Sequence, residues 1–401
     1  MKLGPATLVA AAFIGPGTVV TASVAGAHYG YALVWALAFA TIATLILQEM
    51  AARIGVVTQQ GLGENLRHLV QHPLLRLPFY TLVIAAVVVG NAAYQGGNLT
   101  GASIGAETLF QYRHSEFNLW ALVIGVVAAL VLWQGHYKTV ERTLIGLVAL
   151  MSIAFLITFV LTKPNLFALL QGFIPRLPDG AALTMMALIG TTVVPYALFL
   201  HADSARERWH SLSSNQDITQ ALQEARQDIV ISIPLGGLIT LAILSTAASA
   251  FFVHQLTIQG PADLALSMEP IFGSFASVLM GAGLFAAGIS SAITAPLASA
   301  YALTGLLGWS QNLRGSAFRA VWATILVIGV VLASLSIKPL SLIAFAQVTN
   351  GILLPLITLF LLFAVNHKRM GPFKNSRMQN VRGVLVFMFA LFLCVRTLVL
   401  L

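Results

Sequence analysis

Charged residues are scarce in this sequence. Asp, Glu, Lys and Arg together make up 8% of its 401 residues, while 58% of the residues are hydrophobic. A soluble domain carries about a quarter charged residues, which cover its surface. The shortage leaves no room for a separate water-soluble domain, and it predicts that lipid is the solvent for most of the chain.

Cysteine is almost absent as well. The single cysteine, Cys394, falls in the last hydrophobic run. One cysteine excludes a disulfide within the chain and a cysteine-based metal site. The sequence also lacks a Walker A glycine loop, a nucleophile elbow and the spacing of zinc ligands. It therefore predicts neither an enzyme nor a bound cofactor.

Long hydrophobic runs are what the sequence has instead. A helix needs about 20 apolar residues to cross a bilayer, and about eleven such runs use nearly the whole chain. We expect an all-α membrane protein with one transmembrane domain over residues 1–401, whose first run is a retained span. The predicted spans are 6–27, 31–54, 75–106, 118–134, 142–162, 181–203, 229–253, 269–305, 318–336, 341–365 and 383–401.

The positions of the basic residues predict the topology. With a cytoplasmic N-terminus, the only residues on the outer side among the 21 Lys and Arg are Arg113, Lys163, Arg176, Lys338 and Arg396. Cytoplasmic loops carry such an excess of positive charge. We therefore attribute the net charge of +8 to a multi-pass protein in a lipid bilayer, and not to a nucleic-acid partner. The compact loops favour a prokaryotic inner membrane, and the oligomeric state stays open.

Two of the predicted spans are interrupted near their centres. Pro16 lies between two glycines in the first span, and Pro195 follows Gly190 in the sixth. Proline and glycine weaken a helix, and broken helices inside a membrane usually line a cavity. The two breaks are five spans apart, which predicts inverted repeats. We place repeat one at about 6–162, repeat two at about 181–365 and an extra helix at about 383–401.

Four segments resemble the NRAMP family of metal transporters. Residues 15–35 resemble the family's first helix and following turn, and residues 189–201 resemble its sixth helix. Residues 48–55 and 346–348 extend the likeness over essentially the whole chain. The resemblance implies the LeuT-type fold, with 5+5 inverted repeats and alternating access to a central site. It also implies proton-linked transport of divalent transition metals.

The residues that bind metal in this family are replaced here. The family's Asp-Pro-Gly-Asn becomes Gly15, Pro16, Gly17 and Thr18, and its Met-Pro-His becomes Val194, Pro195 and Tyr196. The glutamine of the tenth helix is matched by Gln347. We expect each of the 13 acids to lie in a loop or near a helix end, so the metal ligands stay unknown.

The predicted central site consists of backbone and neutral polar groups. The candidate substrate-binding residues are Gly15, Gly17, Thr18, Thr191, Val194, Tyr196, Gln347 and Asn350. The candidates for gating or a proton relay are His201, Gln95 and Asn98. Histidine titrates near neutral pH, which suits a relay, but His201 is equally compatible with a structural hydrogen bond at a helix end.

Three functions remain open from the residues. The first is a transporter of the family's kind, in which carbonyls, Gln347 and retained water hold a hard divalent cation such as magnesium. The second is a carrier of an organic solute, such as an amino acid or carboxylate, bound at the N-termini of half-helices. The third is a non-transporting sensor. In the first two the partner is a small solute or metal ion.

Overall fold

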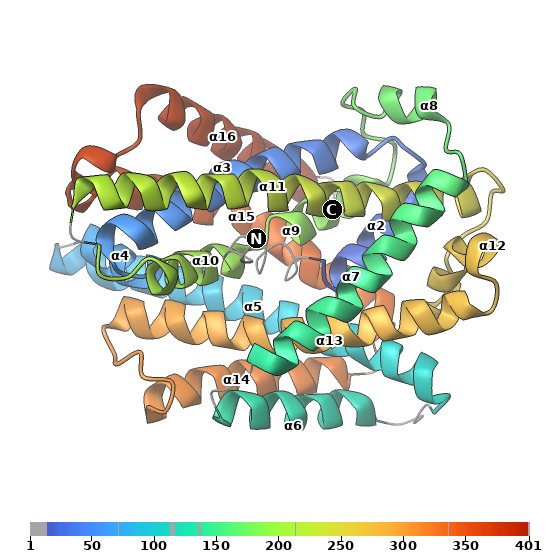
Figure 1. Cartoon of the computed structure of the whole chain (residues 1–401), viewed down its shortest axis with the longest axis horizontal. Helices are drawn as coiled ribbons and strands as arrows, with labels where there is room; N and C mark the ends of the chain where they lie inside the picture. The colour runs from blue at the N-terminus through green and yellow to red at the C-terminus, as the bar shows by residue number, and fades with distance from the viewer. Residues whose placement is uncertain are drawn as a thin grey trace.

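The protein is an elongated bundle of helices. The computed structural model describes residues 14–70, 72–112, 117–134, 138–212, 214–335 and 337–399. These residues form helices and no β-strand, which confirms the predicted all-α class. Helix α4 (Leu62–Leu69) lies at one end of the bundle and α8 (Leu166–Gln171) at the other (Figure 1). We call these the α4 end and the α8 end.

The helices that run between the two ends follow the predicted spans. Within the described ranges, nine helical stretches are long and apolar enough to cross a membrane. Helix α2 (Pro16–Tyr29) is the second part of the first predicted span, whose residues 6–13 lie outside the described residues. The others are α3 (Val34–Thr58), α5 (Pro73–Phe110), α6 (Leu119–Gln134), α7 (Lys138–Leu161), α9 (Ala182–Thr192), α10 (Pro195–Arg208), α11 (Asn215–Ala247), α13 (Phe275–Leu307), α14 (Ser316–Ala333), α15 (Pro339–Asn366) and α16 (Arg377–Val399).

Helix α11 begins well before the predicted span at 229. Ser214 caps its first turn, because its hydroxyl accepts from the backbone N–H of Asp217 while the Asp217 carboxylate accepts from that of Ser214. This reciprocal pair is a capping box. The polar residues 215–228 therefore extend the helix beyond its apolar part. Short elements that were not predicted join the spans: α4, α8, η2 (Pro261–Ser267) and η3 (Lys368–Phe373). Two irregular elements fall inside predicted spans: η1 (Ala248–Phe252) at the end of 229–253, and α12 (Glu269–Phe272) at the start of 269–305.

Small residues let the central helices approach closely. Helices α5 and α13 lie side by side (Figure 1). A Cβ at Gly105 would lie 2.4 Å from the backbone nitrogen of Phe285, and one at Gly288 would lie 2.5 Å from Cβ of Ala102. Contacts of this kind drive helix association in lipid, where burial from water gives no net attraction. The two helices thus form a rigid wall beside the broken spans.

Candidate functional site

The first break lies at Gly15 and Pro16. Gly15 has an extended backbone, with φ −95° and ψ −178°, and Pro16 is the first residue of α2. The Gly15 carbonyl accepts from the backbone N–H groups of Thr18 and Val19, at 3.0 and 3.3 Å. The N-terminal turn of α2 is therefore closed onto Gly15. The other arm of the predicted break lies outside the described residues.

The second break separates α9 from α10. Val193 and Val194 have non-helical backbones, and Pro195 begins α10. Because Pro195 has no N–H, a helix running through this point would leave a carbonyl without its usual donor. The single hydroxyl proton of Thr44 on α3 is shared between the Ala40 carbonyl of its own helix, at 2.8 Å, and the Thr192 carbonyl, at 3.2 Å. Thus α3 satisfies a backbone group that the break sets free.

The two breaks meet through a pair of threonines. Oγ1 of Thr18 on α2 lies 2.9 Å from Oγ1 of Thr191 on α9. Both side chains are fully buried, with exposed fractions of 0% and 1%. Sequence analysis predicted that both belong to one site, and the structure brings them into direct contact.

Gln347 lies between the two breaks. A Cβ at Gly17 would lie 2.2 Å from the side-chain amide nitrogen of Gln347. A Cβ at Gly190 would lie 2.0 Å from the backbone carbonyl oxygen of Gln347. Neither side-chain atom of the buried Gln347 amide has a hydrogen-bond partner among the described residues, and the same is true of Asn350 one turn further along α15. Buried polar atoms are normally hydrogen-bonded, so unpaired ones point to water or an ion.

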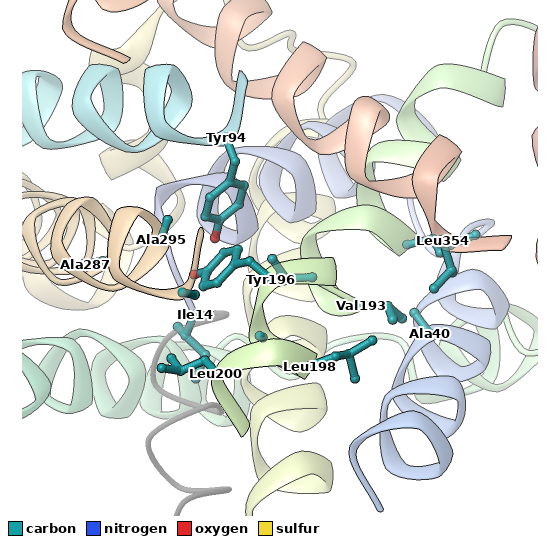
Figure 2. Close-up of a cluster of buried hydrophobic side chains, with 14 of the residues drawn as sticks. Ile14, Ala40, Tyr94, Val193, Tyr196, Leu198, Leu200, Ala287, Ala295 and Leu354 are labelled. Carbon is teal, nitrogen blue, oxygen red and sulfur yellow. The ribbon is translucent and has the colours of Figure 1, made fainter. Parts of the chain in front are cut away.

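Tyr196 packs against an aromatic residue of α5. Its ring lies 5.1 Å from that of Tyr94, centroid to centroid, and Figure 2 shows Tyr94 pointing toward it. Sequence analysis missed Tyr94. Val194, predicted to lie at the site, is buried and supplies only a backbone carbonyl, which accepts from the N–H of Ala197. It therefore contributes no side-chain ligand.

Polar residues of α5 form a row along α13. Nδ2 of Asn91 donates to the Ser299 hydroxyl, and Nε2 of Gln95 donates to the Ala292 carbonyl at 3.1 Å. Both side-chain atoms of Asn98 are buried without a partner in the described part of the chain. The predicted relay positions Gln95 and Asn98 are thus neutral amides, and neither can release a proton at physiological pH.

Sequence analysis gave His201 two alternative roles, a proton relay and a structural hydrogen bond. The structure contains such a hydrogen bond. Nδ1 of His201 lies 2.5 Å from Oε1 of Gln48 on α3, and both residues are buried. Gln48 follows Thr44 by one turn, so α3 contacts both sides of the second break. A role of His201 in proton transfer stays a prediction.

Close packing and ion pairs hold the α4 end together. A Cβ at Gly55 would lie 2.0 Å from the Ala202 carbonyl oxygen, so α3 and α10 touch backbone to backbone. Arg206 on α10 pairs with Glu64 on α4 at 3.0 Å and with Asp203 at 3.3 Å. The expectation that every acid lies in a loop or near a helix end is wrong for Glu49 and Asp228, which lie well inside α3 and α11. Asp203 lies near the end of α10 as expected, but its side chain is buried and only 4% exposed. Arg206 offsets the electrostatic penalty of this burial.

A cavity lies on the opposite side of the threonine pair, toward the α8 end. Its volume is about 300 Å³. Thr21, Ala187 and Ala344 in its wall lie one turn from Thr18, Thr191 and Gln347. The full lining is Val20, Thr21, Val24, Leu183, Thr184, Ala187, Ser341, Ala344, Phe345 and Val348. The site therefore has a cavity on one side and packed helices on the other.

The side-chain donors at this site are all neutral. Among the described residues, no group of three or more His, Cys, Asp or Glu is placed to hold a metal ion. What the site offers is the hydroxyls of Thr18 and Thr191, the amide of Gln347 and nearby carbonyls. These oxygen atoms suit a hard cation that keeps part of its water shell, or a neutral polar solute.

The family of this protein is shown by a profile that matches almost the whole chain. The family profile described as "Natural resistance-associated macrophage protein-like" covers residues 6–400. The chain belongs to this family. That confirms the resemblance drawn from residues 15–35 and 189–201.

Relatives of this NRAMP chain are similar over most of their length. A protein of Klebsiella pneumoniae subsp. pneumoniae, named "Divalent metal cation transporter MntH", is 29% identical over 391 residues, which cover 95% of this chain and 89% of that protein. A protein of the same name from Yersinia pestis is 26% identical and covers 96% and 91%.

Solved structures confirm the fold. A manganese transporter of Eremococcus coleocola has a TM-score of 0.78 at 21% identity and covers 98% of this NRAMP chain and 84% of its own. MhsT in complex with L-phenylalanine has a TM-score of 0.64 at 14% identity, covering 100% and 98%. The predicted LeuT-type fold is confirmed, and the predicted break of the sixth span lies between α9 and α10. The first arm of the predicted break in the first span lies outside the described residues, and the 5+5 inverted repeats stay a prediction.

Proposed function

We propose that this NRAMP protein is a secondary transporter that moves a divalent metal cation by alternating access. The observation that carries the proposal is the contact of the two breaks at Thr18 and Thr191, with the unpaired Gln347 amide beside them. Relatives named for divalent metal cation transport support it.

The ligand chemistry defines the expected selectivity. Soft sulfur ligands favour later transition metals, whereas oxygen ligands suit magnesium, calcium and manganese. Val194 stands where the family has methionine, and Gly15 stands where it has aspartate. We therefore expect a partly hydrated cation held by Thr18, Thr191 and Gln347, with weak affinity and little preference for manganese over magnesium.

The distribution of space around the site supports alternating access. A cavity adjoins the site next to Thr21 on its α8 side, while the contacts of Gly55 and Arg206 close the α4 end. With the topology predicted from basic residues, the α4 end is cytoplasmic and this arrangement faces outward. Repeat one at 6–162 and repeat two at 181–365 then rock against each other around the threonine pair.

The test is uptake by the purified protein in liposomes. Entry of Mn²⁺ and of Mg²⁺ is followed with trapped metal-sensitive dyes, and entry of amino acids and carboxylic acids with isotope labels. We expect both metals to enter, and Gln347→Leu to reduce their entry at least tenfold. The control is Thr240→Val, which removes an equally buried hydroxyl on α11 that bonds only to the Gly236 carbonyl of its own helix.

Each other result has a distinct meaning. Uptake of an organic acid without uptake of either metal overturns the metal proposal in favour of an organic carrier. Absence of any uptake, with the protein correctly folded, favours the non-transporting sensor. Metal uptake that survives Gln347→Leu unchanged refutes the proposed ligand site while leaving the transporter assignment intact.

A further inference from the structure

A groove lies between three helices at the α4 end, away from the central site. Its volume is about 400 Å³, and α3, α11 and α16 form its walls. The floor is apolar and consists of Leu45, Ile46, Met50, Ile229 and Val230. The rim is polar and consists of Glu49, Arg226, Gln379 and Arg382.

The rim carries a positive charge. Glu49 is its only carboxylate and is shared by two guanidinium groups, those of Arg53 at 2.8 Å and Arg226 at 3.0 Å. Arg382 is exposed and forms no ion pair among the described residues. Arg226 also remains open to a ligand, since its side chain is 47% exposed. The two rim guanidinium groups, Arg226 and Arg382, outnumber the single rim carboxylate, and Arg53 further neutralises that carboxylate, so the rim favours an anionic ligand and opposes a cation.

Other positively charged residues also lie at the α4 end. Helix η3 contacts α3 there, because Arg53 donates to the Phe373 carbonyl and to Asn375. Burial, and next the neighbouring charges of Lys368 and Arg369, lower the pKa of His367. Lys368, Arg369 and Lys374 thus add positive charge at this end of the bundle.

The apolar floor continues along the seam between α3 and α11. Val230 is 63% exposed, and Ile42, one turn from Ile46, is 56% exposed. Ile42 also lines a second cavity of about 320 Å³ in the same seam, together with Thr41, Pro234 and Leu238. In a membrane, an exposed apolar seam that ends in a positive rim matches an acyl chain joined to a phosphate.

We propose that this groove binds an anionic phospholipid, with the phosphate between Arg226 and Arg382 and an acyl chain along Leu45, Ile46 and Val230. Basic residues at the ends of membrane helices attract anionic headgroups. The phosphate would bridge α11 and α16 on either side of Glu49. Helix α3, which carries Glu49, also carries Thr44, the residue that bonds the second break.

The test uses native mass spectrometry of the full-length protein released from detergent micelles. The micelles contain either phosphatidylglycerol or phosphatidylcholine with identical acyl chains. We expect a retained phosphatidylglycerol that phosphatidylcholine does not replace. Arg382→Gln should lower phosphatidylglycerol affinity about fivefold, the effect of one basic residue near the headgroup. Because Arg382 has no ion pair in the described structure, this substitution leaves the fold intact.

Two further variants separate the headgroup from the acyl chain. Arg396→Gln removes one exposed arginine from the other end of α16 and should leave binding unchanged. Val230→Trp fills the floor without altering charge and should weaken binding as strongly as Arg382→Gln. Equal retention of the two lipids, or equal effects of Arg382→Gln and Arg396→Gln, overturns the proposal. Displacement of the lipid by free glycerol phosphate would instead show a simple phosphate site, and it also overturns the proposal.

Discussion

Thr18 and Thr191 connect the two broken spans through hydroxyl oxygens 2.9 Å apart, although 173 residues separate them in the chain. One belongs to α2 and the other to α9. A hydrogen bond therefore joins two half-helices that the proposed transport cycle would move relative to each other. A substrate that takes these oxygens as ligands has to loosen this bond.

Replacing Thr191 with valine tests this connection. The substitution keeps the shape and removes the hydroxyl, so the loss of one buried hydrogen bond should lower the free energy of unfolding by about 1 kcal/mol. Metal uptake by Thr191→Val should fall well below that of Thr240→Val, which also loses one buried hydrogen bond. Thermal unfolding and liposome uptake measure the two effects, and Thr240→Val shows what a remote buried threonine contributes. Equal uptake by the two variants would contradict a ligand role for Thr191.

Gly17 should tolerate no side chain. In Gly17→Ala, the new Cβ would lie 2.2 Å from the Gln347 amide nitrogen, so the amide must leave its position between the breaks. We expect metal uptake to fall at least tenfold. Gly146→Ala on α7 is a matched control, because a Cβ there meets nothing within 4 Å and alanine favours the helix by about 1 kcal/mol. Normal uptake by Gly17→Ala would show that Gln347 does not hold the substrate from this position.

Restoring the family's ligands should create a tight manganese site. The triple variant Gly15→Asp, Thr18→Asn and Val194→Met supplies a carboxylate, an amide and a thioether. Gly15 has a negative φ of −95°, which aspartate also adopts. We expect manganese affinity to rise at least tenfold over the natural chain, while magnesium affinity rises less because sulfur disfavours hard ions. Isothermal titration measures both. Tight manganese binding by the natural chain, unchanged in the variant, would place the site elsewhere.

Proton influx should accompany uptake only weakly. Gln95 and Asn98 cannot titrate, and His201 is held by Gln48 in a buried hydrogen bond. A pH-sensitive dye inside the liposomes measures proton entry during metal uptake. His201→Gln should abolish the small remaining flux, and Asn91→Ala, which alters a buried amide on α5, should not. Strong proton flux that persists in His201→Gln would reveal a relay through other residues.

The sequence was most informative where chemistry is local. Pro16 and Pro195 interrupt hydrophobic runs, and a proline has the same effect on a helix wherever it occurs, so the break at Pro195 and the start of α2 at Pro16 were both predicted. The membership of Thr18, Thr191 and Gln347 in one site followed from resemblance and from these breaks. The start of α11 was predicted too late, because the polar residues after Ser214 suggested a loop, whereas the capping pattern Ser214 to Asp217 indicates a helix start.

Contacts between elements that are far apart in the chain could not be predicted from the sequence. Nothing near Asp203 in the chain shows that the start of α4 folds over it, so its burial was missed. Tyr94 lies in an apolar run as an ordinary aromatic residue, and only the arrangement of α5 against α10 makes it the neighbour of Tyr196. A partial signal did exist for α3, where Thr44 and Gln48 place two polar side chains on one helical face within an apolar run.

The contacts of α3 determine how the sixth span can move. Thr44 and Gln48 lie four residues apart, about 6 Å along a continuous helix, and they hold Thr192 on one side of the break and His201 on the other. The non-helical link at Val193 and Val194 is thus bridged by a continuous helical segment of α3. Bending there has to break at least one of these two hydrogen bonds, so α3 opposes any change in the angle between α9 and α10.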